Sequence, residues 1–144
     1  MKIKAIFLLA LLCTMVQGAW ATDYNVGNET DLTNAIVDGA NITLTDNINL
    51  SSAITIGDGK TVTIDLNGHT LNHDIKNGGM GRVIAIDEGG TLTINDASGD
   101  NSGKITGGTL LIGLEVDGAG IYNNGTLTIN GGSITGNSGE SQDL

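Results

Sequence analysis

Apolar and polar residues alternate through most of the chain from residue 41 onward. Ile, Leu or Val takes every second position in a series of short segments: Ile42 and Leu44; Ile48 and Leu50; Ile54 and Ile56; Val62, Ile64 and Leu66; Ile84 and Ile86; Leu92 and Ile94; Leu110 to Val116; Leu127 and Ile129. A period of two predicts strands with one apolar face. Clusters of Gly, Asn and Asp separate the segments, so we expect an all-β chain with many turns.

The stretch before these strands has a helical period instead. Leu32, Ala35 and Ile36 fall on one face of a helix, and Gly39 suits its end. The pattern predicts one helix over Thr30–Asp38, although a loop could carry the same residues by chance.

A ten-residue motif, I-x-x-x-x-T-[VL]-T-I-[DN], occurs three times and decides between two architectures. The copies begin at Ile56, Ile86 and Ile121, which are 30 and 35 residues apart. In an antiparallel sandwich, Asp58-Gly59 and Asn124-Gly125 would be hairpin turns. In a β-solenoid, each copy forms two sides of one coil, and coils stack in parallel about 4.8 Å apart. Repetition favours the solenoid, because stacking places like residues on like residues.

The solenoid predicts columns of equivalent residues from coil to coil. The columns are Val62, Leu92 and Leu127; Ile64, Ile94 and Ile129; Leu71, Ile105 and Ile134; and, at a turn, Asp65, Asn95 and Asn130. Ile42 and Leu44 are interpreted as an earlier copy 20 residues before Val62 and Ile64, and residues 96–102 as a loop that bulges from the second copy.

Residues 1–21 have the features of a secretory signal peptide. Lys2 and Lys4 form a basic start, Ala5–Val16 is apolar, and Ala19-Trp20-Ala21 supplies a small-x-small cleavage site. The apolar run is shorter than the roughly 20 residues that a membrane-spanning helix needs. We therefore expect export, to the cell surface or the medium, with no membrane anchor after cleavage.

The chain after cleavage is acidic and lacks cysteine. Its four basic residues, Lys60, Lys76, Arg82 and Lys104, stand against 16 acidic ones, for a net charge of −12. Such a surface repels nucleic acid and anionic membranes. Without disulfides, stability must come from packing and backbone hydrogen bonds. The 123 residues suffice for one domain, divided into a cap over residues 22–40 and β-coils over residues 41–144.

Three stretches carry a family resemblance: DLTNAI at 31–36, KTVTIDLNGHTL at 60–71 and GAGIYNNGTLTINGGSITGN at 118–137. Through them the chain resembles the right-handed parallel β-helix proteins of the pectin-lyase-like superfamily, particularly exported bacterial surface proteins. The resemblance implies that the predicted helix caps the solenoid. Family members usually have more coils and a closed carboxyl-terminal end. It therefore also implies that the last coil here pairs with further coils of its own chain or with another copy.

The superfamily includes polysaccharide lyases and hydrolases, so the resemblance also implies an enzyme alternative. Lyases are expected to use a basic residue as proton acceptor, and Arg82 is the only arginine. A hydrolase needs two carboxylates on neighbouring coils. Asp87 and Glu88 correspond to Tyr122 and Asn123 in the next copy, so no such pair is expected, and no catalytic residue is assigned.

Metal ligands are equally sparse in the sequence. His69 and His73 are four residues apart, but on a strand and a turn they would not converge. Asp96 and Asp100, with Ser98 and Ser102 between and after them, place oxygens at alternate positions, as calcium loops do. The central Gly and final acidic ligand of an EF-hand are missing, so a plain polar loop is favoured. No cofactor is predicted.

Threonines form the most distinctive predicted surface. Since the apolar columns point inward, Thr43, Thr61, Thr63, Thr91, Thr93, Thr126 and Thr128 are expected to point outward. Exposed strand positions favour Thr in any case. We interpret the protein as an adhesin or glycan-binding module with no catalysis in this segment, and with a polysaccharide or a host-surface glycan or protein as partner. The alternatives are the amino-terminal part of a polysaccharide lyase or hydrolase, and an ice-binding protein that uses the Thr ladder.

Overall fold

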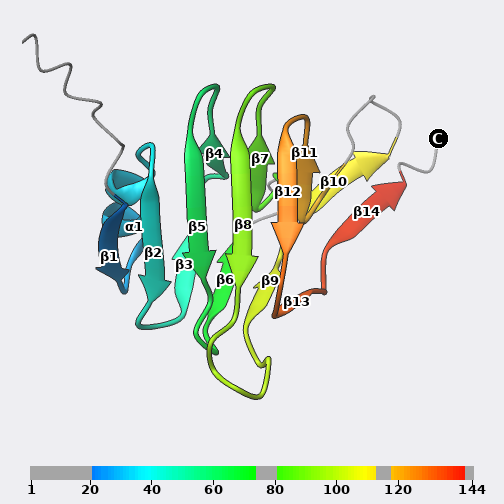
Figure 1. The fold of residues 1–144 in the computed structure, drawn as a ribbon. Coiled ribbons are helices and arrows are strands. Elements are labelled where there is room, and N and C mark those ends of the chain that lie inside the picture. The colour runs from blue at the N-terminus through cyan, green and yellow to red at the C-terminus, as the bar shows by residue number, and fades with distance from the viewer. Residues whose placement is uncertain (1–20, 74–80, 113–117, 142–144) are drawn as a thin grey trace, which may run out of the picture.

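The computed structural model describes residues 21–73, 81–112 and 118–141. Residues 1–20 of the predicted signal peptide and the end of the predicted strand at Leu110–Val116 lie outside these ranges. One short helix, α1 (Glu29–Ala35), precedes most of the strands (Figure 1). The fold is therefore all-β with a single short helix in the described ranges, as the alternation predicted.

Four parallel sheets contain the strands. The first sheet has the order β1 (Thr22–Val26), β2 (Ala40–Leu44), β5 (Thr61–Asp65), β8 (Thr91–Asn95), β12 (Thr126–Ile129). The second contains β3 (Ile48–Leu50), β6 (Thr70–His73), β9 (Lys104–Thr106) and β13 (Ser133–Ile134). The third contains β4 (Ile54–Ile56), β7 (Ile84–Ile86) and β11 (Ile121–Asn123). The fourth pairs β10 (Thr109–Ile112) with β14 (Ser138–Ser141).

The chain visits the first three sheets in a repeating order. From β2 it passes to β3 and β4, returns to the first sheet at β5, and repeats the route through β6 and β7 (Figure 1). We call one such passage a coil. Every pair of named strands is parallel, which excludes the antiparallel sandwich. The arrangement is compatible with a β-helix-like solenoid.

The predicted apolar columns are confirmed by the strand register. Val62, Leu92 and Leu127 are neighbours, as are Ile64, Ile94 and Ile129 in the first sheet and Leu71, Ile105 and Ile134 in the second. Side chains of the earlier coils are fully enclosed in the core, whereas Ile129 and Ile134 of the last coil are 47% and 42% exposed. Within the described residues, no further strand covers the outer side of β12 or β13.

The alignment of the third motif copy was wrong at its first residue. Ile121 pairs with Ile84 rather than Ile86, and Ile86 lies beside Asn123. Four residues, 87–90, connect β7 to β8, but only residues 124–125 connect β11 to β12. A shift of two residues keeps every side chain on its original face, so the alternation survives and the turn absorbs the difference.

The offset of the earliest copy was also wrong. Ile42 pairs with Ile64 and Ala40 with Val62, so the two strands are 22 residues apart instead of 20. This again preserves the inward face, because the error is an even number.

Helix α1 is confirmed with different ends. It begins at Glu29, one residue before the prediction, because the Asn28 side chain accepts a hydrogen bond from the Asp31 backbone N–H and caps it. It stops at Ala35, since Ile36 already leaves the helical conformation. The cap region also contains β1, which the sequence did not predict and which pairs with β2.

Polar side chains also pair from coil to coil, next to the apolar columns. Asn130 donates through Nδ2 to Oδ1 of Asn95 at 2.9 Å, as expected for stacked amides. Asp65, the third member of that column, instead accepts the backbone N–H groups of Asn67 and Ala97. A second amide pair joins Asn72 to Asn49 in the next sheet.

We expect Ile64→Ala to destabilise the protein far more than Ile129→Ala. Ile64 is fully buried between Ile42 and Ile94, and a buried Ile-to-Ala change costs about 2 to 5 kcal/mol. The half-exposed Ile129 should cost about 1 kcal/mol or less. Chemical denaturation followed by circular dichroism measures both, and equal losses would contradict the packing described.

Candidate functional site

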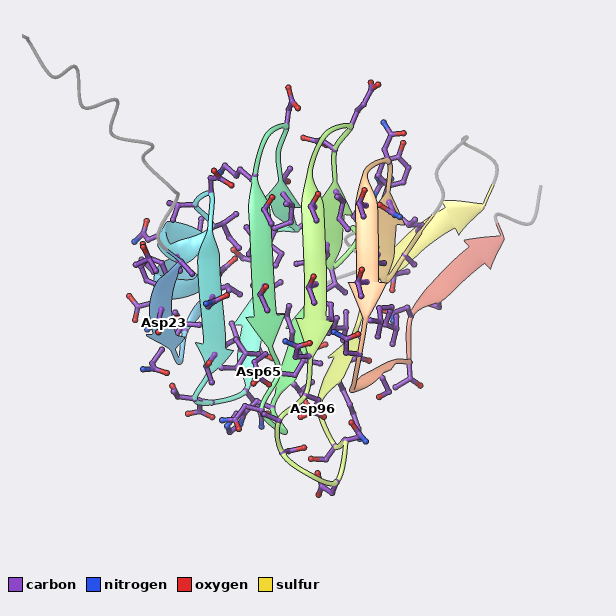
Figure 2. All side chains as sticks on the ribbon, viewed as in Figure 1. Asp23, Asp65 and Asp96 are labelled. Atoms are coloured by element: carbon purple, nitrogen blue, oxygen red, sulfur yellow. The ribbon has the colours of Figure 1, made fainter. Side chains whose placement is uncertain are left out.

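Two columns of threonine lie on the outer face of the first sheet. Strand register places Thr61, Thr91 and Thr126 side by side, and likewise Thr63, Thr93 and Thr128. These side chains are exposed or half-buried, because the residues between them point into the core. Strands β5, β8 and β12 carry them side by side (Figures 1 and 2).

The two columns form a regular array of hydroxyl groups. Neighbouring strands lie about 4.8 Å apart, and alternate residues along one strand lie about 6.6 Å apart. Among the described residues, none of the six hydroxyls has a hydrogen-bond partner. We call these six residues the Thr face: Thr61, Thr63, Thr91, Thr93, Thr126 and Thr128.

The prediction that Thr43 continues the threonine columns was wrong. Thr43 lies beside Asp65, while Asn41 lies beside Thr63. The cause is the 22-residue offset between β2 and β5, which moves Thr43 one step beyond the columns. The Thr face therefore covers three strands and ends at β2.

The loop at residues 96–102 is organised by its own carboxylates. Asp96 follows β8, and Asp65 ends β5, so both lie where these neighbouring strands of the first sheet end (Figure 2). Oδ1 of Asp96 accepts the backbone N–H of Gly68 at 2.8 Å, and its Oδ2 accepts that of Gly103 at 2.7 Å. Burial raises the pKa of Asp96, but hydrogen bonds from Ser98, Gly103 and Gly68 outweigh it and hold the pKa below its usual value.

Asp100, the other weak metal candidate, lies at the exposed tip of this loop. It accepts hydrogen bonds from the Ser98 hydroxyl and from the Ser102 backbone N–H, and both residues lower its pKa. Within the described ranges, no group of three His, Cys, Asp or Glu side chains converges as a metal site would require. The oxygens of Asp96 and Asp100 thus serve to close the loop.

The remaining acidic candidates are exposed at a turn. Asp87 and Glu88 lie between β7 and β8. Tyr122 lies beside Ala85 and Asn123 beside Ile86, so the predicted correspondence of these two residues to Asp87 and Glu88 was wrong. The two-residue shift of β11 is the reason.

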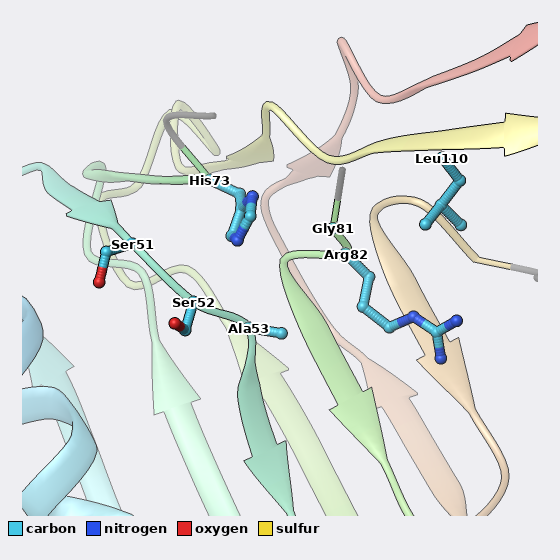
Figure 3. A pocket seen from close by; sticks show the side chains of 7 residues that line it. All are labelled: Ser51, Ser52, Ala53, His73, Gly81, Arg82 and Leu110. Atoms are coloured by element: carbon cyan, nitrogen blue, oxygen red, sulfur yellow. The ribbon is translucent and has the colours of Figure 1, made fainter. Parts of the chain in front are cut away.

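A pocket of about 420 Å³ opens where the second sheet connects to the third. It is lined by Ser51, Ser52, Ala53, His73, Gly81, Arg82 and Leu110 (Figure 3). His73 ends β6, Arg82 precedes β7, and the two serines follow β3. The sequence had singled out His73 only because it lies four residues after His69, and Arg82 only because it is the sole arginine. The coil geometry brings His73 and Arg82 to the same pocket.

His73 is the buried polar residue of this pocket. It is 6% exposed, and its Nδ1 has no hydrogen-bond partner in the described residues. Burial lowers the pKa of His73, although the charge of Glu29 partly opposes the shift, so the ring is neutral at neutral pH. The ring packs on Gly81, where a Cβ atom would come within 2.7 Å of its Cε1 atom.

Glu29 is hydrogen-bonded to the two serines that line the pocket. Its carboxylate accepts the hydroxyl and backbone N–H of Ser51 at 2.8 Å each, and the backbone N–H of Ser52 at 3.3 Å. The Ser51 bonds are the main reason that the pKa of Glu29 is lowered. The first turn of α1 is thereby attached to the second sheet.

Comparison of the chain with protein-family models, with curated proteins and with solved structures finds no match. Among the described residues, no helix is both long and apolar enough to cross a lipid bilayer.

We expect Asp96→Asn to lower stability by about 1 to 3 kcal/mol, because an amide cannot accept backbone N–H groups at both of its ends. The lowered pKa of Asp96 means that its ionised form stabilises the fold above the unfolded pKa of about 3.9. That contribution disappears as the pH falls through the folded pKa. The melting temperatures of the unmodified protein and of Asp96→Asn should therefore begin to converge below about pH 4 and should meet once the pH is below the folded pKa.

Asp100→Asn is the control in the same loop, and it should have a smaller effect. Calcium should leave the melting temperature unchanged, since backbone groups already occupy the Asp96 oxygens. A calcium-dependent rise that Asp96→Asn abolishes would show that the loop is a metal site instead.

Proposed function

We propose that this chain is an exported surface protein whose strands form a right-handed parallel β-helix of the pectin-lyase-like kind. Parallel strands joined through neighbouring sheets almost always cross over in the right-handed sense, which supports the handedness. The repeating visits to three sheets and the stacked columns support the β-helix.

Its proposed role is to bind glycans through the Thr face, without catalysis in this segment. The single observation that carries this role is the register of six outward hydroxyls over three adjacent strands, none partnered within the described residues. A hydroxyl both donates and accepts hydrogen bonds, as do the hydroxyls of sugars. An uncharged patch on an otherwise acidic protein suits a neutral glycan better than an anionic one.

The mechanism is repeated weak contact along the stack of coils. One hydrogen bond contributes only about 0.5 to 1.5 kcal/mol, so a single threonine holds little. Contacts at the strand spacing act together on a chain-like ligand, because the first contact raises the effective concentration of the next. A polymer is therefore expected to bind more tightly than its monomer.

Ice binding is the second candidate, and the regular spacing of the same hydroxyls favours it. Thermal hysteresis of the purified protein distinguishes the two. Thermal hysteresis in a protein that binds no glycan would favour ice binding over the proposed role.

The double variant Thr63→Val/Thr93→Val should weaken glycan binding about tenfold or more. It removes two central hydroxyls and keeps the branched shape that suits a strand, and two lost hydrogen bonds cost about 2 kcal/mol. A glycan array of neutral oligosaccharides identifies the best ligand, and calorimetric titration then measures the affinity of each variant.

Thr55→Val is the matched control, because Thr55 is an exposed threonine in β4 of the third sheet. It should bind like the unmodified protein. Equal affinity of the double variant and this control would exclude the Thr face as the binding surface.

A further inference from the structure

The pocket between the second and third sheets has the size of a small-ligand site. Its volume of about 420 Å³ lies in the lower part of the usual range for such sites, about 300 to 1,000 Å³. That space accommodates one sugar residue better than a chain. It is built by residues of the first two coils together with Leu110 of β10, so it is separate from the Thr face of the first sheet.

Arg82 lines this pocket without an acidic partner among the described residues. It is the only arginine of a sequence with 16 acidic residues, yet its one described contact is with an aromatic ring. The Cζ atom of Arg82 lies 4.3 Å from the centroid of the Tyr122 ring. Stacking on the ring restrains the guanidinium, and its N–H groups have no described hydrogen-bond acceptor. The planar fork of these groups matches a carboxylate, to which it donates two parallel hydrogen bonds.

The other end of the pocket has a different chemistry. Figure 3 shows His73 between the serines and Arg82. Glu29 already holds Ser51, whereas the Ser52 hydroxyl has no described hydrogen bond. Neither nitrogen of the His73 ring has a described hydrogen bond either. A largely buried polar group without a hydrogen-bond partner is energetically costly unless a ligand supplies that partner. A neutral imidazole and a hydroxyl suit the hydroxyl or amide groups of a ligand.

We propose that this pocket binds a terminal acidic sugar residue. In this site Arg82 holds the carboxylate, while Ser52 and His73 contact the neutral polar groups. Glu29 lies at the serine end, so its negative charge disfavours a ligand that enters with the carboxylate reversed. This inference does not rest on the Thr face, which would bind a neutral polymer.

The test is a titration of the isotope-labelled protein with N-acetylneuraminic acid and with its methyl ester, followed by NMR. The ester differs from the acid in having a methyl group on one carboxyl oxygen, which removes the negative charge. The acid should bind at least about tenfold more tightly, since a charge-assisted bond contributes about 1.5 to 3 kcal/mol. Shifts should centre on residues around Arg82 and His73.

Arg82→Gln should reduce the affinity for the acid to the affinity for the ester. Arg82→Lys should keep only part of the affinity for the acid, because lysine has the charge but lacks the planar fork. Thr63→Val/Thr93→Val should bind the acid normally, which separates failure here from failure of the Thr face. Circular dichroism verifies that each variant is folded.

Equal binding of acid and ester, absence of binding by the acid, or full binding by a folded Arg82→Gln variant would overturn the proposal. If that variant does not fold, the comparison of acid with ester on the unmodified protein still decides whether the carboxylate is recognised.

Discussion

In-register stacking of parallel strands is the constraint on which the other features of this protein depend. Ile64 is enclosed because Ile42 lies on one side of it and Ile94 on the other, and the same holds for each inner position of the columns. Backbone hydrogen bonds fix the strands relative to one another, so length differences between coils cannot enter the strands. They are accommodated at the turns, which is why four residues connect β7 to β8 but two connect β11 to β12.

Acidic side chains stabilise the places where the chain leaves this stacking. Asp96 gathers backbone N–H groups from Gly68 and Gly103 and closes a seven-residue loop against the preceding coil. Glu29 does the same for the two serines after β3 and attaches α1 to the sheet. In both cases ionisation strengthens the hydrogen bonds, so these carboxylates have lowered pKa values. Part of the large negative charge is therefore structural.

The outer surface offers two kinds of polar chemistry, and both follow from the coil. The Thr face arises because equivalent positions of successive coils must lie side by side, which turns a repeated T-x-T into a two-dimensional array. The pocket arises outside the repeated motif, where paired positions carry different residues: His73, for example, lies beside Leu50 of the preceding coil. Regular positions favour a repetitive ligand, and the irregular corner favours a single compact one.

The sequence by itself determined the strands, their inward faces and the columns through Leu92, Ile94 and Ile105, because alternation and repetition are local properties that a period of two records directly. Strand β1 was missed, since TDYNV alternates only weakly. The neighbours of Ile121 and Thr43 were decided only by the tertiary structure: a shift of two residues leaves the apolar pattern unchanged, so turn length selects the register. The meeting of His73 with Arg82 was likewise beyond the sequence, because their distance depends on how one coil returns upon the last.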